Sequence, residues 1–499
     1  MDRGSERRRL VVVSNRLPVT FKKIEGEWQM VPGSGGLVTA LSPVLKNRGG
    51  VWMGWPGIPE QPDQERISSL LAGQLSTSGY HLHPVLLTPE EVRDFYYGFS
   101  NEVIWPLFHD LQTRCRFLPR YWYRYLEVNR KFAQHIKEIS RPKDYIWVHD
   151  YHLIHLGSYL KELGVNRSIG FFLHIPFPPL DIFLKLPWRD QVLKAMLDYQ
   201  LIGFQTLRDR RNFLTCVNHL FRGVEVKVQG RGPLVNLRVG EREVLVGSFP
   251  ISIDFDAFSS GASSKKVADW AWYIHENLPN KQILLGIDRL DYTKGIPERL
   301  EAFRDALSRF PELRGKVTLV QVVVPSREEV AEYQELKGEI ERLVGEINGQ
   351  FTGSGWVPIH YLYRHLERDE LLAYYRASEI ALVTPLKDGM NLVCKEFCAC
   401  DVDERGVLIL SEFAGAAAQL HKHSLVVNPY DIEGMANAIK NAFDMPYQER
   451  SRRMRRLREG IRKNNIFKWV NSYLEAAFTK NLDDFPEIEP EEYLPKIEV

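Results

Sequence analysis

Four cationic side chains follow short apolar runs of this sequence, at positions suited to binding phosphate. Arg16 follows one run, Arg289 and Lys294 follow a second, and Arg327 follows a third. Arginine can grip a phosphate through two parallel hydrogen bonds, and lysine adds a compact point charge. If these four side chains converge, they predict a site for phosphorylated ligands.

Histidine and carboxylate side chains stand at the ends of further apolar runs. His149-Asp150 follows one run, and His174 follows the next. The segment Asp388–Glu396 combines a carboxylate, a glycine turn and a predicted helix whose second turn carries Glu396. Such a turn directs backbone N–H groups at a ligand, and its carboxylates can accept hydrogen bonds from sugar or ribose hydroxyls. The alternative for Asp388 is an acidic residue that only stabilises a helix N-terminus.

Two other kinds of segment could contact a sugar phosphate. Gly33-Ser34-Gly35-Gly36 precedes an expected helix start, so its backbone could approach a phosphate, although it could equally be a structural turn. It lacks the G-x-G-x-x-G pattern and the acidic residue about 20 positions later that a nicotinamide site needs. Trp52–Trp55 and Tyr96–Pro106 concentrate rings that can pack on a sugar face, although most such aromatic side chains belong to a core.

The elements that position these residues are predicted to be strands of parallel sheets covered by helices. Continuous apolar runs rich in β-branched residues suit strands that are buried on both faces. The runs are Leu10–Val13, Tyr145–Val148, Ser168–Leu173, Ile283–Ile287, Val317–Val324, Ile380–Thr384 and Val407–Leu410. Between them, Glu329–Ile347 has apolar residues at helical spacing and is expected to end at Asn348-Gly349. The pattern predicts the α/β class with doubly wound sheets, in which ligands bind beyond the carboxyl ends of the strands.

The chain has 499 residues, which is long enough for two large domains. The apolar runs thin out over Val224–Ile253, where valine-rich segments alternate with glycines and indicate a hairpin. A new series of strands and helices begins at Ile283. We place the domain boundary near residue 250, which gives two Rossmann-like domains over 1–250 and 251–463.

Charge and hydropathy exclude several classes of protein. Lys and Arg sum to 65 and Asp and Glu to 64, so the formal charge of +1 argues against a protein that mainly coats nucleic acid or anionic membrane. The basic stretch Arg452–Arg458 is better explained as the solvated face of a helix. No window reaches the roughly 18 apolar residues of a membrane span, and the apolar run after the basic N-terminus is too short for a secretory signal. We therefore expect no nucleic-acid or membrane partner and a cytoplasmic location.

The cysteine pattern and the motifs that the sequence lacks argue against several kinds of site. The five cysteines suit a reducing compartment without a disulfide framework. Cys394, Cys398 and Cys400 have no companion ligand at zinc-finger spacing, which favours buried thiols over a zinc site. The sequence shows no metal-ligand spacing, nucleophile elbow or P-loop. We expect an enzyme that transfers a group between phosphorylated sugars by positioning and electrostatics, with no metal and no cofactor.

Five segments, in order along the chain, carry a resemblance to a known family. The sequence resembles the trehalose-6-phosphate synthases, which are retaining glycosyltransferases of the GT-B fold, with two Rossmann-like domains facing a cleft. The resemblance covers nearly the whole chain, and its most specific segments are Phe99–Pro106, Trp147–Leu153, Gly170–Pro178, Asp288–Gly295 and Thr384–Val393. The fold also implies that a C-terminal helix, about 464–499, crosses back to the first domain.

The resemblance implies a specific reaction. Glucose would move from a nucleotide donor, usually UDP-glucose, to glucose 6-phosphate with retention of the α configuration. The products would be α,α-trehalose 6-phosphate and UDP. The departing phosphate is expected to take the proton of the incoming hydroxyl, so no side chain attacks the sugar.

The resemblance also implies roles for the acceptor-binding residues. The acceptor phosphate is expected to bind Arg16, Tyr96, Trp105 and Arg327. The acceptor glucose is expected to contact Trp55 and Asp150.

The donor-binding residues follow from the same resemblance. Arg289 and Lys294 would hold the diphosphate, His174 and Asp388 would hold hydroxyls of the transferred glucose, and Glu396 would accept from the ribose. The catalytic set would be Arg289, Lys294, His174 and Asp388. The whole expected donor set is Gly35, Gly36, His174, Arg289, Lys294, Asp388, Gly389, Met390, Asn391, Leu392, Val393 and Glu396.

The sequence departs from the family pattern at two places, and three alternative functions stay open. The segment 17–33 looks longer than in the shortest bacterial members, and Leu366 stands where some members carry an aromatic residue near the nucleotide base. The nearest alternative is a glucosylglycerol-phosphate synthase, whose acceptor is glycerol 3-phosphate. A catalytically silent sugar-phosphate sensor and a pyridoxal-phosphate phosphorylase are the others. A homo-oligomer, dimer or tetramer, is also expected.

Overall fold

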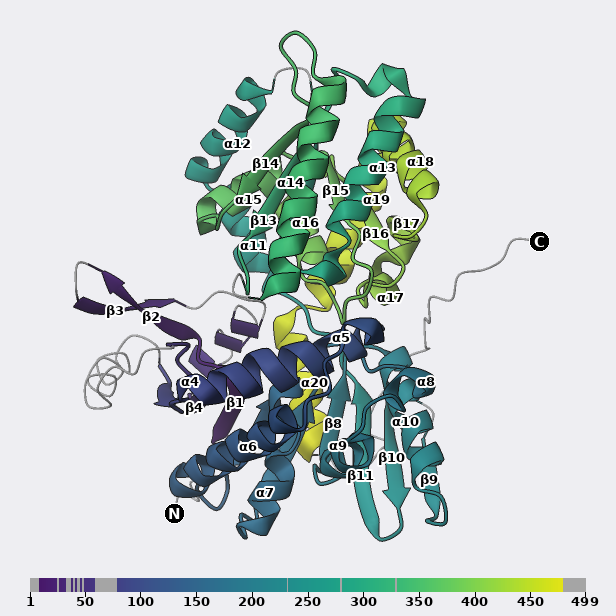
Figure 1. The fold of residues 1–499 in the computed structure, drawn as a ribbon. Helices are drawn as coiled ribbons and strands as arrows, with labels where there is room; N and C mark the ends of the chain where they lie inside the picture. Colours follow the sequence, from purple (N-terminus) through teal and green to yellow (C-terminus); the bar gives the residue numbers. More distant parts are fainter. Residues whose placement is uncertain are drawn as a thin grey trace. The chain divides into compact units, whose positions relative to one another are not determined.

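The computed structural model describes residues 9–24, 27–32, 37–38, 41–42, 45–46, 49–58, 79–230, 232–278, 281–327 and 330–478. Within these residues the chain forms two compact units (Figure 1). Unit 1 runs to Pro250 and resumes at Trp469, and unit 2 covers Ile251–Lys468. None of the helices in the described ranges has the length and apolar character needed to span a bilayer.

Unit 1 is built on a nine-stranded sheet. Its strands, in spatial order, are β5 (His81–Pro84), β4 (Val51–Trp55), β1 (Leu10–Arg16), β6 (Tyr145–His149), β7 (Ser168–Phe172), β8 (Leu201–Phe204), β11 (Arg242–Ser248), β10 (Leu234–Val239) and β9 (Val226–Gln229). The pairs from β5 to β11 are parallel, and β10 and β9 add antiparallel strands at one edge. This edge is the hairpin predicted within Val224–Ile253. A separate hairpin pairs β2 (Val19–Ile24) with β3 (Glu27–Pro32).

The helices of unit 1 follow the strands, as in a parallel α/β sheet. They are α4 (Pro89–Glu91), η1 (Val92–Ile104), α5 (Trp105–Phe108), η2 (Gln112–Arg114), α6 (Pro119–Ile139), η3 (Tyr151–Leu153), α7 (Leu156–Glu162), α8 (Leu180–Phe183), α9 (Arg189–Met196) and α10 (Leu207–Leu220). The last helix, α20 (Ile466–Phe478), lies mostly in this unit. There the ring of Tyr473 stacks on that of Trp147 with centroids 4.3 Å apart, and its hydroxyl donates to Phe171 O at 3.3 Å.

Unit 2 is built on a six-stranded sheet in which every neighbouring pair is parallel. Its strands, in spatial order, are β14 (Ile359–Tyr363), β13 (Val317–Val324), β12 (Gln282–Arg289), β15 (Ile380–Val383), β16 (Val407–Ser411) and β17 (Leu425–Val427). Its helices are α11 (Phe255–Ser263), α12 (Lys265–Asn277), η4 (Tyr292–Lys294), α13 (Ile296–Arg309), η5 (Pro311–Leu313), α14 (Ala331–Phe351), α15 (Arg368–Ala377), α16 (Val393–Cys400), α17 (Ala417–Leu420), η6 (His421–His423), α18 (Ile432–Asp444) and α19 (Tyr447–Lys463).

The burial pattern explains why these segments become strands. Every residue of β4, β6, β8, β15 and β16 is buried, as expected for strands covered on both faces. Several helices begin at a side-chain cap, such as Thr206 on Asp209 N–H and Asp431 on Gly434 N–H. The predicted α/β class with parallel sheets is confirmed.

One predicted boundary is wrong. Helix α14 continues through Asn348-Gly349 and ends at Phe351. The Asn348 side chain does not stop the helix, because it hydrogen-bonds to both the N–H (2.9 Å) and the C=O (3.0 Å) of Ile359 at the start of β14. The basic stretch Arg452–Arg458 lies on α19, whose Met454, Leu457 and Ile461 are buried.

Candidate active site

In unit 1, Arg16 lies against two aromatic rings. Its Cζ is 4.1 Å from the ring centroid of Trp55 and 5.3 Å from that of Tyr96, within the range of cation–π attraction. Arg16 ends β1, and Trp55 ends the neighbouring parallel strand β4, which sets the two side by side. A side chain at Gly57, whose φ is +83°, would collide with the Arg16 guanidinium. The rings and this glycine therefore hold an exposed guanidinium at the carboxyl end of the sheet.

Tyr96 and Trp105 lie around the turn that follows β6. Tyr96 belongs to the π-helix η1, and its ring stacks on His152 with centroids 5.9 Å apart. The ring of Trp105 lies 5.8 Å from that of Tyr151. Asn101 links η1 to the turn after β6, since its amide donates to Tyr96 O at 2.6 Å and its Oδ1 accepts from the Tyr151 hydroxyl at 3.0 Å. The structure thus brings together the aromatic residues predicted for the acceptor.

Asp150 and His174 stand at neighbouring strand ends and contact each other. Asp150 has a φ of +74°, which turns the chain sharply after β6, and its Oδ1 accepts from His174 N–H at 3.2 Å. The His174 ring lies between His149, whose Nδ1 is 3.0 Å from His174 Nε2, and Gln205, whose amide nitrogen is 3.5 Å from His174 Nδ1. An amide nitrogen only donates, so His174 Nδ1 accepts and its Nε2 carries the proton toward His149.

Burial keeps this imidazole uncharged. Removal from water lowers the pKa of His174 to about 3, and it lowers the pKa of His149 well below its usual value. Both ring nitrogens of this neutral His174 have a partner, but the contact of Nδ1 with Gln205 is long at 3.5 Å, so Nδ1 is the acceptor that a ligand could take over. That suits a sugar hydroxyl and does not suit a phosphate oxygen.

In unit 2, Lys294 and Asp388 form an ion pair. Lys294 Nζ donates to Asp388 Oδ2 at 2.6 Å, and neither side chain is more than 16% exposed. The Asp388 loop is fixed by the chain that follows β16, since Gly415 N–H donates to Asp388 O at 3.0 Å and Ala416 N–H donates to Met390 O at 2.8 Å. A Cβ at Gly415 would collide with Gly389 O, so this close approach requires glycine. The two predicted donor residues therefore meet on a rigid loop.

The rest of the Asp388–Glu396 segment follows the predicted layout with one correction. Asn391, with a φ of +75°, donates to Asp388 Oδ2 at 3.3 Å and accepts from Cys394 N–H at 3.1 Å at the start of α16. Glu396 lies in the first turn of α16, and the predicted second turn is wrong because the helix begins only at Val393. Burial raises the pKa of Glu396, and the Tyr375 hydroxyl donates to its Oε2 at 2.8 Å.

Arg289 and Arg327 both lie in unit 2, at the ends of adjacent strands. Arg289 is the exposed last residue of β12 and pairs in register with Val324, the last residue of β13. Arg327 follows β13 with a φ of +51°, and its Nη1 contacts the Tyr333 hydroxyl and lies 3.5 Å from Asp291 Oδ2. Arg327 and Arg16, both predicted for the acceptor phosphate, thus belong to different units.

Several site-supporting residues escaped the sequence prediction. Arg299, on α13, is buried and donates to Asp288 at 2.6 Å and to Thr384 at 3.0 Å. Its Nη2 also lies 3.4 Å from the carbonyl of Lys294. Tyr333 and Tyr375 sit on helices as well. Asp288 and Asp291 lie in the predicted segment Asp288–Gly295, but nothing in the sequence assigns them a partner.

The remaining predicted residues lie outside the contacts described above. Gly35 and Gly36 lie outside the described residues. Leu366, which is expected near the nucleotide base, is 5% exposed. All five cysteines are free, and Cys394, Cys398 and Cys400 are buried. Within the described ranges, no group of three His, Cys, Asp or Glu side chains could hold a metal ion.

Comparison with known proteins decides the family. The model of glycosyltransferase family 20 matches residues 8–478. The chain belongs to glycosyltransferase family 20. The family 20 relative from Mycobacterium sp. (strain JLS), a trehalose-6-phosphate synthase, is 42% identical over 483 residues, which cover 96% of this chain and 98% of that protein. The trehalose-6-phosphate synthase of Mycobacterium tuberculosis (strain ATCC 25618 / H37Rv) is 42% identical over 476 residues, covering 93% and 94%.

Solved structures agree with this family 20 assignment. The α,α-trehalose-phosphate synthase (UDP-forming) of Burkholderia xenovorans in complex with glucose-6-phosphate matches with a TM-score of 0.84 and 33% identity, covering 94% of this chain and 99% of that one. An E. coli structure bound with UDP-2-fluoro glucose matches with a TM-score of 0.82 and 35% identity, also covering 94% and 99%. The expected GT-B fold and the resemblance to trehalose-6-phosphate synthases are confirmed.

Proposed function

We propose that this family 20 enzyme is an α,α-trehalose-phosphate synthase (UDP-forming), which transfers glucose from UDP-glucose to glucose 6-phosphate and releases UDP. The observation that carries the proposal is identity of 42% to a trehalose-6-phosphate synthase across 96% of the chain. Relatives with glucose-6-phosphate or UDP-2-fluoro glucose bound support the two substrates.

We assign the acceptor to the aromatic and cationic groups of unit 1, together with Arg327. Arg16, held against Trp55 and Tyr96, offers a charged donor for a phosphate. Asp150, at the sharp turn after β6, supplies a carboxylate for glucose hydroxyls. Glycerol 3-phosphate carries the same phosphate but has no ring to pack on Trp55, so this arrangement favours glucose 6-phosphate.

We assign the donor to the groups of unit 2, together with His174. In the transfer, the bond between C1 of glucose and the diphosphate oxygen breaks, and the incoming hydroxyl forms the new bond on the same face. Its proton passes to the departing phosphate oxygen. Arg289 and Lys294 stabilise the negative charge that grows on the leaving diphosphate, which lowers the barrier. Neutral His174 accepts from a hydroxyl without repelling the cationic sugar of the transition state.

The same cations make a metal ion and a cofactor unnecessary in this proposal. Activity is expected to survive extensive treatment with a chelator, measured as UDP release before and after dialysis. We also propose a cytoplasmic location, because both substrates are charged metabolites that do not cross membranes, and a homo-oligomeric state, which light scattering would test.

One assay tests the proposed reaction. The enzyme is incubated with UDP-, GDP- or ADP-glucose and with an equimolar mixture of glucose 6-phosphate and glycerol 3-phosphate, and the products are identified by mass spectrometry. We expect a phosphorylated disaccharide and UDP, and neither from an Arg289→Ala, Lys294→Ala variant. A glucosylglycerol phosphate would establish the alternative acceptor. Calorimetric binding of the substrates without release of any nucleotide would identify a sensor instead.

A further inference from the structure

Asp291 is a buried carboxylate that contacts two parts of the donor unit at once. It follows β12 and is 2% exposed. Its Oδ1 accepts from the N–H of Thr293 at 3.0 Å and from the Thr293 hydroxyl at 2.9 Å. Its Oδ2 lies 3.5 Å from Arg327 Nη1 and accepts from the Tyr333 hydroxyl at 3.5 Å. Each carboxylate oxygen therefore serves a different partner.

We propose that Asp291 is a positioning residue that fixes Arg327 through one carboxylate oxygen and the turn carrying Lys294 through the other. The inference rests on the proposed function, in which Arg327 binds the acceptor phosphate and Lys294 the donor diphosphate. It adds a residue that touches neither substrate but sets the placement of a cation for each.

The guanidinium of Arg327 requires a nearby negative charge. The Arg327 side chain is only 6% exposed, and a buried guanidinium without a counter-charge is strongly unfavourable. Burial alone would raise the pKa of Asp291, but the charges of Arg327, Lys294 and Arg289 and the Thr293 N–H hold that pKa below its usual value. Asp291 is thus ionised and lies within ion-pair distance of Arg327. The Tyr333 hydroxyl contacts both Arg327 and Asp291 and closes the group.

The Thr293 side holds the backbone of η4. Thr293 is fully buried, and Lys294 N–H donates to Asp291 O at 3.1 Å, so Asp291 fastens this turn through both its side chain and its carbonyl. The Lys294 ammonium leaves the turn toward Asp388. A shift of the turn would therefore move the cation assigned to the donor.

The two oxygens can be separated by substitution. Asp291→Asn keeps Oδ1 as an acceptor for Thr293 but turns an NH₂ group toward the Arg327 donors and removes the charge. Asp291→Ala removes both contacts. We expect Asn to raise the KM for glucose 6-phosphate about tenfold or more, with the KM for UDP-glucose changed by less than about threefold, and Ala to raise both.

Initial-rate measurements of UDP release, with each substrate varied in turn, test the inference. Asp305→Asn serves as the control, because Asp305 pairs with Arg309 on the exposed face of α13 and its loss should leave both KM values unchanged. If Asp291→Asn fails to fold, Tyr333→Phe replaces it and should raise only the acceptor KM. An active wild type whose Asp291→Asn variant keeps the acceptor KM, or raises both KM values equally, would overturn the inference. A wild type that releases no UDP would instead overturn the proposed function.

Discussion

The ion pair between Lys294 and Asp388 places opposite charges on two residues that were each predicted to bind the donor. The pair is short, at 2.6 Å, and both partners are largely shielded from water. In this arrangement Asp388 balances the lysine charge until a diphosphate arrives. A bound diphosphate would share the ammonium, which has three N–H donors and can serve both anions. Asp388 therefore orients the lysine, in addition to the role proposed for it in holding a hydroxyl of the sugar.

Replacing Lys294 should remove transition-state stabilisation, and it should also lower the unfolding temperature because the shielded Asp388 carboxylate loses its partner. We expect Lys294→Ala to lower kcat/KM for UDP-glucose by about 10²–10³-fold, the usual cost of losing one group that stabilises developing negative charge. Steady-state kinetics and a thermal melt measure the two effects. Lys266→Ala is the matched control, since it also breaks a Lys–Asp pair of unit 2, but one in which both side chains are exposed. Near-normal turnover in Lys294→Ala would contradict the assignment.

At the scale of elements, strands that are buried on both faces can be predicted from their apolar sequence. An element whose end depends on a tertiary contact cannot. The run Val317–Val324 matches β13 at both ends, because a strand buried on both faces is mostly apolar, and its two polar residues, Thr318 and Gln321, are buried as well. The end of α14 was predicted wrongly, because the stop signal at Asn348 is overridden by its hydrogen bonds to Ile359. A rule based on neighbouring residues fails where the side chain instead hydrogen-bonds to backbone groups of another element.

For the candidate site, too, some residues could be predicted from the sequence and others could not. Residues that directly follow strands, such as Arg16, Asp150 and Asp388, could be predicted from position alone. Arg299 could not, because in an amphipathic helix an arginine normally indicates the solvent side. Its partners, Asp288 and Thr384, come from two different strand ends, and only the sheet topology brings them to α13.

The Arg299 cluster should be a major source of stability for unit 2. Arg299→Met leaves the Asp288 carboxylate buried without its cation, which we expect to cost about 3–5 kcal/mol of unfolding free energy. Burial already raises the pKa of Asp288, so an uncharged residue there should be better tolerated. Adding Asp288→Asn to Arg299→Met should recover part of the loss, as measured by urea unfolding. A double variant less stable than Arg299→Met would show that the ion pair is not the stabilising element.

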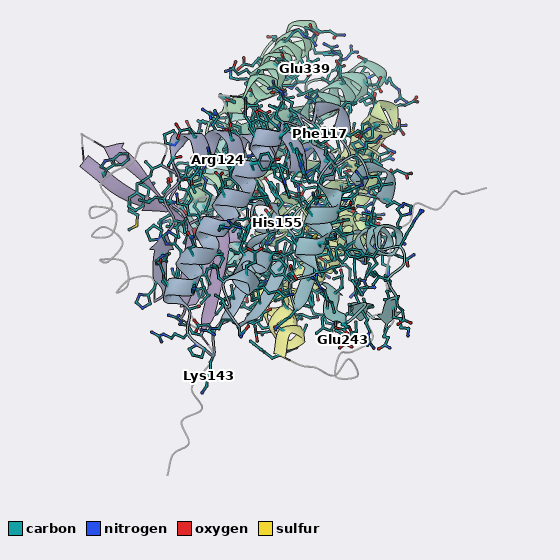
Figure 2. The ribbon with its side chains drawn as sticks, turned by 60° about the horizontal axis from the view of Figure 1, so that its bottom comes forward. Phe117, Arg124, Lys143, His155, Glu243 and Glu339 are labelled. Atoms are coloured by element: carbon teal, nitrogen blue, oxygen red, sulfur yellow. The ribbon has the colours of Figure 1, made fainter. Side chains whose placement is uncertain are left out.

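At the scale of the whole molecule, the histidines of unit 1 have a consequence for stability. Five histidines of unit 1 have lowered pKa values: His149 well below its usual value, His155 to about 4, His174 to about 3, and His83 and His135 below their usual range. The cause in each case is removal from water. His155, which is labelled in Figure 2, packs edge-on against Trp122 with ring centroids 5.0 Å apart.

This burial sets the pH dependence of stability in unit 1. Below about pH 6.5 the unfolded chain binds protons on these histidines while the folded chain does not, so stability is fully present above that pH and falls as the pH drops toward 4. Calorimetry should show an unfolding transition whose Tm decreases between pH 7.5 and 5. His155→Gln removes one of these groups, so the decrease should be smaller, even if Tm at pH 7.5 is lower. The exposed His81 supplies the control, and His81→Gln should leave the slope unchanged. An equal slope in His155→Gln and wild type would mean that other groups govern the acid sensitivity.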